Sequence, residues 1–166
     1  MKSIIFLLFS VTVLAQTPIR TASADGVSVS LYKFDGFRPF LEREDDTIYV
    51  LNFWATWCAP CIKELPAFEK LGAQYAHKNV KVILVSLDFT SKVEKSLLPF
   101  IVKKKLKLPV VHLNSTDAND WVDKVNPDWS GSIPATLIYS RDQSQFYERS
   151  FTFDELESEV QKFIKS

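Results

Sequence analysis

Two cysteines, Cys58 and Cys61, are the only thiols in the chain. A pair with this spacing can cycle between dithiol and disulfide, can supply part of a metal site, or can form a structural disulfide. A structural disulfide across so short a loop removes little entropy from the unfolded chain, so stability alone is a weak use of the pair. The only histidines, His77 and His112, lack the spacing of further metal ligands, and we expect no metal. Thiol–disulfide exchange is the favoured chemistry.

The elements on either side of the cysteines decide whether these thiols can react. Residues 48–54 form a nearly continuous apolar run rich in β-forming residues, which predicts a strand covered on both faces. After the cysteines, apolar residues recur at spacings of three and four from Ile62 to Tyr75, the pattern of an amphipathic helix. The pair is therefore expected at the N-terminus of a helix, where backbone N–H groups stabilise a thiolate on Cys58.

Exchange at such a pair follows a two-step route and needs no cofactor, so none is expected. Cys58 attacks a substrate disulfide, and Cys61, one helical turn further on, releases the reduced product by closing the Cys58–Cys61 bond. Pro60 lies between the two cysteines and limits how the turn can open.

Further elements are predicted around this unit. Residues 27–31 alternate between apolar and polar side chains between two Asp-Gly turns, which predicts a hairpin strand whose short partner follows Gly36. The remaining patterns predict a buried strand at 80–87, a helix over 93–101, a strand at 110–112, a hairpin of 136–139 with 145–148, and a last helix that starts at the capping-box pair Thr152 and Glu155. This order predicts an α/β sheet with helices on both faces, preceded by an N-terminal hairpin.

Length and charge set limits on the class of protein. The chain has 166 residues, 46% of them hydrophobic, which suits one domain with a substantial core. Twenty basic residues balance twenty acidic ones, so we expect no nucleic-acid partner. The basic stretch 103–107 is interpreted as a solvated face.

The N-terminus has the layout of a secretory signal peptide. Lys2 precedes an apolar run over residues 4–14, and Ala15 is a small residue at the expected cleavage point. An apolar helix of that length reaches roughly 16 Å, about half of the hydrocarbon core of a membrane. We expect a periplasmic or otherwise exported protein with no stable membrane span after cleavage. The expected divisions are a signal peptide at 1–15, a short linker at 16–26 and a folded domain at 27–166.

The residues around the cysteines resemble a known family. The segment 51–61, LNFWATWCAPC, with Glu64, Leu65 and Pro66 after it, resembles the thioredoxin superfamily and, within it, the exported TlpA/ResA-like thiol–disulfide oxidoreductases. The segment 131–136, GSIPAT, resembles the family's second landmark, an apolar residue before a cis-proline opposite the CxxC. The resemblance implies a thioredoxin-like fold with a central mixed sheet flanked by helices.

The same resemblance implies roles for individual residues. Pro134 would be cis, and the backbone of Ile133 would pair with a substrate strand. Trp57 would pack beside the thiols and shape the site, and it is expected to contact substrate together with Ala59 and Pro60.

Glu64 and Asn52 are the residues considered for proton transfer during thiol–disulfide exchange. Glu64 matches an acidic position that modulates the cysteines in the ResA-like branch; a partly buried carboxylate there would raise thiol pKa values or relay a proton. The alternative, a solvated glutamate, stays open. Asn52 departs from thioredoxin itself, which has a proton-accepting aspartate at this position, and asparagine cannot titrate. Glu64 or water would then handle the proton.

Two further interpretations concern residues outside the motifs. Trp121 and Trp129 precede the Ile133–Pro134 pair and are either core residues or a partner surface. His112, in an apolar strand, is interpreted as a core histidine with its hydrogen bonds satisfied.

The resemblance also implies a function and partners. It implies an exported reductase of protein disulfides that receives electrons from a membrane thiol carrier and passes them to disulfide-containing exported proteins, of which apocytochrome c is the family's best-known type. The spacer Ala59-Pro60 lies closer to the Gly-Pro of reducing thioredoxins than to the Pro-His of strong oxidants. A disulfide oxidase or isomerase and a non-catalytic binding module remain as alternatives. We expect a monomer.

Overall fold

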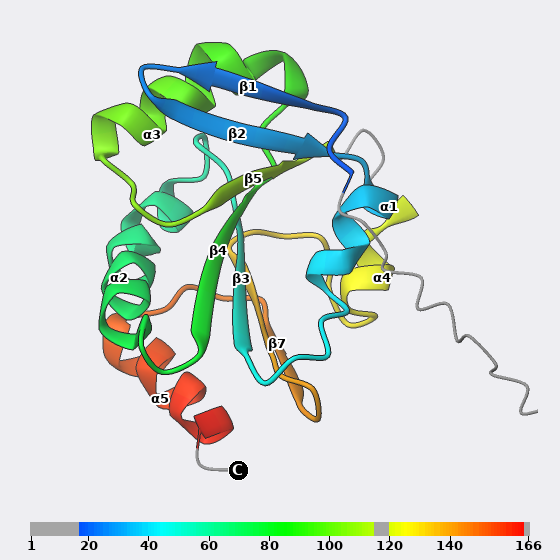
Figure 1. Cartoon of the computed structure of the whole chain (residues 1–166), viewed down its shortest axis with the longest axis vertical. Coiled ribbons are helices and arrows are strands. Elements are labelled where there is room, and N and C mark those ends of the chain that lie inside the picture. The colour runs from blue at the N-terminus through cyan, green and yellow to red at the C-terminus, as the bar shows by residue number, and fades with distance from the viewer. Residues whose placement is uncertain (1–16, 115–119, 165–166) are drawn as a thin grey trace, which may run out of the picture.

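The structure is a computed structural model, and it describes residues 17–114 and 120–164. The signal peptide predicted for 1–15 lies outside the described residues. A seven-stranded mixed sheet forms the centre of the molecule, in the order β1-β2-β5-β4-β3-β6-β7 (Figure 1). Neighbours among β2, β5, β4 and β3 are parallel, whereas β1, β6 and β7 pair antiparallel. The strands are β1 (Arg20–Ala24), β2 (Val27–Tyr32), β3 (Ile48–Trp54), β4 (Val80–Ser86), β5 (Val110–Leu113), β6 (Ala135–Tyr139) and β7 (Ser144–Tyr147).

Helices cover both faces of the sheet. The chain contains α1 (Phe34–Phe37), η1 (Arg38–Phe40), α2 (Ala59–Tyr75), η2 (Thr90–Lys92), the π-helical turn η3 (Val93–Leu97), α3 (Leu98–Lys104), α4 (Val122–Val125) and α5 (Phe153–Ile164). In Figure 1, α2, α3 and α5 lie on one side of the sheet and the short α1 and α4 on the other. The mixed α/β sheet flanked by helices is confirmed.

The central strands separate two hydrophobic clusters. Every residue of β3 is buried, and because neighbouring side chains of a strand point to opposite faces, Val50 packs with α2 and α5 while Leu51 packs with α1 and α4. The near-continuous apolar runs of β3 and β4 reflect this burial on both sides. The two strands are held in parallel register, with Asn52 opposite Leu84, and they end at one edge of the sheet, where the cysteines follow.

The N-terminal hairpin is confirmed, but its partner strand was predicted on the wrong side. β1 precedes the turn at Asp25–Gly26 and pairs with β2 over its whole length. Both turn residues have positive φ, 50° and 77°, the conformation that favours a two-residue hairpin turn. β1 therefore occupies much of the segment 16–26 that was expected to be a linker.

The segment after Gly36, predicted as the partner strand, is helical instead. Phe37 and Phe40 are three residues apart, so a helical backbone brings both rings into the same cluster, with their centroids 5.3 Å apart. The end of the fold matches its prediction, because Thr152 and Glu155 form the expected capping box of α5.

Candidate active site

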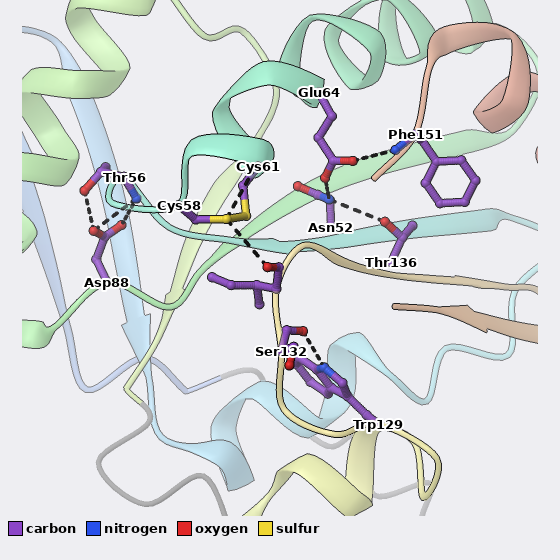
Figure 2. Close-up of a disulfide and its surroundings, with 11 residues drawn as sticks. Asn52, Thr56, Cys58, Cys61, Glu64, Asp88, Trp129, Ser132, Thr136 and Phe151 are labelled. Carbon is purple, nitrogen blue, oxygen red and sulfur yellow. Dashed lines mark hydrogen bonds between the residues drawn. A yellow bond between two sulfur atoms is a disulfide. The ribbon is translucent and has the colours of Figure 1, made fainter. Parts of the chain in front are cut away.

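The two cysteines lie where β3 passes into α2 and form a disulfide (Figure 2). Cys58 is the N-cap of α2, and its sulfur accepts a hydrogen bond from the backbone N–H of Cys61 at 3.3 Å. The N-terminal N–H groups of a helix have no intrahelical acceptors, so they offer the same stabilisation to a Cys58 thiolate. Cys61 is fully buried, whereas Cys58 is 5% exposed. An incoming thiol can therefore reach only Cys58.

The second landmark lies directly opposite the disulfide. The Ile133–Pro134 peptide bond is cis, as the resemblance implied, and the Cys58 sulfur lies 3.7 Å from the Ile133 carbonyl oxygen. Hydrogen bonds hold the loop before this bond in place: the indole N–H of Trp129 donates to the Ser132 carbonyl at 2.8 Å, and the carboxylate of Glu148 accepts from the N–H groups of Ser130 and Ser132.

Glu64 is buried, so the alternative of a solvated glutamate is wrong. Its side chain lies on the sheet-facing side of α2, and each carboxylate oxygen accepts one hydrogen bond at 2.8 Å, from the Asn52 side-chain amide and from the Phe151 N–H (Figure 2). Burial raises the pKa of Glu64 to about 7, although both hydrogen bonds oppose that shift. The site therefore contains a carboxyl group that titrates near neutral pH.

Asn52 links this carboxyl group to the sheet. Its amide nitrogen donates to Glu64 and also reaches the Thr136 hydroxyl at 3.4 Å, while its amide oxygen has no hydrogen-bond partner within the described part of the chain. The strand position at which thioredoxin carries an acid thus holds a neutral donor. The titratable group approaches from α2 instead.

A second buried acid, Asp88, was not identified from the sequence. It follows β4 and is 3% exposed, and its carboxylate accepts hydrogen bonds from the Thr56 N–H at 3.1 Å, the Thr56 hydroxyl, and the Ser86 hydroxyl at 2.9 Å. Asp88 therefore ties the loop before Cys58 to the end of β4 (Figure 2). The signal in the sequence was an acid directly after a buried strand, at the sheet edge that also carries the cysteines.

His112 lies in the core beside this acid, as expected, but only one ring nitrogen has a partner. Nε2 is 2.8 Å from the Asp88 backbone carbonyl, so it carries the proton, and Nδ1 has no partner among the residues the structure describes. Burial lowers the pKa of His112. The neutral ring is thus the form that packs in this strand.

Exposed aromatic side chains flank the disulfide. Trp57 is 60% exposed and Phe89 is 70% exposed, and both line a cavity of about 510 Å³ together with Ile133. Ala59 and Pro60 are also exposed, in the first turn of α2. The predicted contact residues therefore surround the one reachable sulfur, and Phe89 is an addition that the sequence pattern did not reveal.

Trp121 and Trp129 are core residues. They are 4% and 3% exposed, and their rings make an edge-to-face contact with centroids 5.4 Å apart. The interpretation of these two side chains as a partner surface is wrong, because both indoles pack into the cluster beneath α4.

Neither a metal centre nor a membrane span is found in the described part of the chain. In residues 17–114 and 120–164, no three His, Cys, Asp or Glu side chains form a group that can hold a metal ion. None of the helices in these ranges has the length and apolar character needed to cross a membrane.

Several proteins with known structures share this fold. A thioredoxin family thiol:disulfide interchange protein from Chlorobium tepidum superimposes with a TM-score of 0.62 at 14% identity, over 93% of this chain and 99% of that one. StoA from Bacillus subtilis superimposes with a TM-score of 0.56 at 18% identity, over 89% of this chain and 98% of that one. At these identities the likeness concerns the fold, and it confirms that the fold is thioredoxin-like.

Sequence comparison adds closer relatives. The chain is 34% identical to the thiol-disulfide oxidoreductase ResA of Oceanobacillus iheyensis over 110 residues, which are 65% of this chain and 53% of that protein. It is 39% identical to the thioredoxin-like protein YneN of Bacillus subtilis over 114 residues, 66% of this chain and 59% of that protein. The chain thus spans a little over half the length of these relatives. Residues 19–144 match the model of the AhpC/TSA family, and the chain belongs to that family.

Proposed function

We propose that this protein is a thiol–disulfide oxidoreductase that reduces protein disulfides outside the cytosol. The observation that carries the proposal is the Cys58–Cys61 disulfide at the N-terminus of α2, with only Cys58 reachable and with the Ile133 carbonyl opposite it. The names of the relatives, which include thiol-disulfide oxidoreductases, support the same chemistry.

The reaction starts from the reduced dithiol. The Cys58 thiolate attacks one sulfur of a substrate disulfide, which forms a mixed disulfide and releases the other substrate sulfur as a thiolate. The Cys61 thiolate then attacks the Cys58 sulfur, closes the Cys58–Cys61 disulfide and releases the second substrate sulfur. Two electrons pass to the substrate, and its two thiolates take up two protons.

The second step needs Cys61 to lose its proton, and Glu64 is the proposed acceptor. Glu64 is three residues after Cys61 on α2, and burial holds its pKa at about 7. A group whose pKa lies near the working pH accepts and returns a proton with little cost in either direction. Asn52 orients this carboxyl group by donating to Oε1.

The surface around Cys58 suits an extended apolar segment of a substrate protein. The Ile133 backbone offers hydrogen-bonding groups beside the reacting sulfur, as the family resemblance implies, and Trp57 and Phe89 offer exposed aromatic surface on the same side. Exposed aromatic side chains that line a cavity are a common device for anchoring a partner.

The proposed location and partners rest on the N-terminal sequence and on the chemistry. The signal-peptide layout of residues 1–15 supports export, and an exported reductase needs a source of electrons from across the membrane. We therefore propose a membrane thiol carrier as the donor and disulfide-containing exported proteins, with apocytochrome c as one candidate, as acceptors.

The mechanism is tested by trapping its intermediate. A Cys61→Ser variant, reduced and mixed with a disulfide-containing protein, should accumulate a mixed disulfide through Cys58, because the resolving thiol is absent. Cys58→Ser is the matched control and should form no adduct. Non-reducing electrophoresis and mass spectrometry detect the species. Equal adduct formation by the two variants, or none by either, would refute the assigned roles.

The direction of electron flow is tested by the midpoint potential of the Cys58–Cys61 couple. Equilibration in defined thiol buffers, read by alkylation, should give a value near that of thioredoxin, about −270 mV. A value near about −120 mV would identify an oxidase instead. Absence of a reversible two-electron transition would favour a non-catalytic binding module.

A further inference from the structure

A second cavity lies along α2 and shares no lining residue with the cavity beside Cys58. It has a volume of about 660 Å³ and lies between α2 and the segment 104–108, which begins at the last residue of α3 and leads towards β5. Ligand-binding cavities in proteins commonly have volumes of roughly 300 to 1,000 Å³ and mainly apolar walls. The apolar walls here come from Ile62, Leu65, Pro66, Phe100, Leu106 and Leu108.

Four lysines surround this apolar cavity. They are Lys70 on α2 and Lys104, Lys105 and Lys107 on the opposite side, and all four are exposed. None of them forms an ion pair within residues 17–114 and 120–164. The chain as a whole has no net charge, so this concentration of positive charge is local.

One carboxylate also lies at the rim, and its hydrogen bonds are directed into the protein. Oε1 of Glu69 accepts from the backbone N–H groups of Lys107 at 3.0 Å and of Leu108 at 3.1 Å. Glu69 thereby holds the segment that carries three of the lysines against α2. The three lysines of this segment are left as the groups available to a ligand.

We propose that this cavity binds an anionic amphiphile, with the apolar chain inside and the carboxylate or phosphate head at the lysines. An inorganic anion would leave the apolar walls in contact with water, and a neutral hydrocarbon would leave Lys104, Lys105 and Lys107 without an anionic partner. Lys70 already has a cation–π partner, because its Nζ lies 3.5 Å from the centroid of the Phe153 ring. Lysine side chains suit this position because their methylene stems line apolar surface while the ammonium groups stay at its edge. The ligand is either a free fatty-acid anion or an anionic phospholipid of a membrane surface.

The first experiment measures binding of sodium dodecanoate, below its critical micelle concentration, by isothermal titration calorimetry with the purified oxidised protein. We expect a single site per chain. Dodecyltrimethylammonium has the same chain length and the opposite charge, and it should bind at least tenfold more weakly. Equal binding of the two amphiphiles would overturn the proposal, because the lysines would then contribute nothing.

Charge variants test the rim. Lys104→Gln combined with Lys107→Gln should weaken dodecanoate binding about tenfold or more, because each lysine near an anionic head contributes several-fold to the affinity. The matched control, Lys33→Gln combined with Lys124→Gln, removes the same charge beside α1 and α4 and should leave the affinity unchanged. A similar loss in both double variants would overturn the proposal.

A cavity variant tests whether the chain enters between α2 and segment 104–108. Ala73 lines the cavity from an exposed position of α2, so Ala73→Glu and Ala73→Gln, both good helix formers, should fold. The glutamate should abolish binding by bulk and repulsion, and the glutamine should weaken it less. Unchanged affinity in both variants would show that the ligand lies elsewhere and would overturn the proposal.

Vesicles distinguish the two sources of the ligand. Vesicles of phosphatidylglycerol and of phosphatidylcholine are sedimented with the protein and its variants. Retention on phosphatidylglycerol alone, lost in Ala73→Glu and in the Lys104/Lys107 variant, would assign the site to a membrane lipid. Dodecanoate binding without vesicle retention would assign it to free fatty acids. If Ala73→Glu is retained on the vesicles as well as the wild type and dodecanoate does not bind, the lysines attract the membrane by surface charge alone. That outcome would overturn the proposal.

Discussion

Glu64 and Asp88 lie on two sides of the disulfide and are equally buried, each 3% exposed, but their surroundings differ. Glu64 accepts one hydrogen bond at each oxygen, from Asn52 and from the chain at Phe151. Asp88 accepts from three groups, the N–H and hydroxyl of Thr56 and the hydroxyl of Ser86.

The two carboxylates therefore differ in which parts of the chain their hydrogen-bond donors connect. With two donors, the cost of burial prevails at Glu64 and its pKa rises to about 7, which suits proton transfer. The three donors to Asp88 come from the loop before Cys58 and the end of β4, so Asp88 holds the backbone that presents the cysteine.

The largest effect is expected at Asp88. Asp88→Ala leaves the N–H and hydroxyl of Thr56 and the hydroxyl of Ser86 without their acceptor, and the free energy of unfolding should fall by about 3 kcal/mol. Urea denaturation of the oxidised protein measures it. Asp88→Asn keeps one acceptor oxygen and should lose less. A loss below about 1 kcal/mol for the alanine variant would contradict the positional role.

A smaller effect is expected from the titration of Glu64. Its folded pKa, about 7, lies above the ordinary value of 4.5, so between these pH values the folded state holds a proton that the unfolded state has released. The free energy of unfolding should therefore decrease as the pH rises from 4.5 to 7, by about 2 kcal/mol.

Glu64→Gln should remove this decrease, and Glu42→Gln, at an exposed position, should leave it in place. The measurement is urea denaturation of each variant between pH 4 and 8. If the wild type and Glu64→Gln show parallel pH profiles, Glu64 does not titrate in this range.

The smallest effect is expected at Glu148. This carboxylate tests whether the cost of losing an acceptor depends on burial or on the number of donors. Like Asp88, it accepts from three groups, the N–H and hydroxyl of Ser130 and the N–H of Ser132, but it is exposed. Water can replace the lost acceptor, so Glu148→Ala should cost less than about 1 kcal/mol in the same urea experiment. A loss equal to that of Asp88→Ala would mean that donor number alone sets the cost.

The sequence predicted the elements that carry the cysteines because their patterns are set by burial. β3 and β4 are covered on both faces, and α2 buries one stripe of apolar residues, so each shows a continuous or periodic apolar pattern. The N-cap position of Cys58 followed from this junction alone. The cis bond at Pro134 followed only from the family resemblance, because the residues by themselves equally allow a turn proline.

The features that the sequence did not predict have a different physical cause. They depend on contacts between distant parts of the chain, which leave no local pattern in the sequence. β1 has one buried residue, Ala22, and its hydroxyl side chains pair with those of β2 instead of entering the core. Asp88 is recognised only when β4 brings it beside Thr56, 32 residues earlier in the chain. Whether Trp121 and Trp129 are core or surface depends on a cluster formed with Phe53 and Phe146, from distant strands.

The five residues 148–152, which join β7 to α5, contact both the loop before Ile133 and the helix α2. The Glu148 side chain holds the loop before Ile133, and the Phe151 N–H donates to Glu64 on the cysteine-bearing helix. For protein engineering this linker is the wrong place for a tag, a protease site or a new terminus. The exposed turn at Asp142–Gln143, in the hairpin just before it, is the place to attach a fluorophore or open the chain.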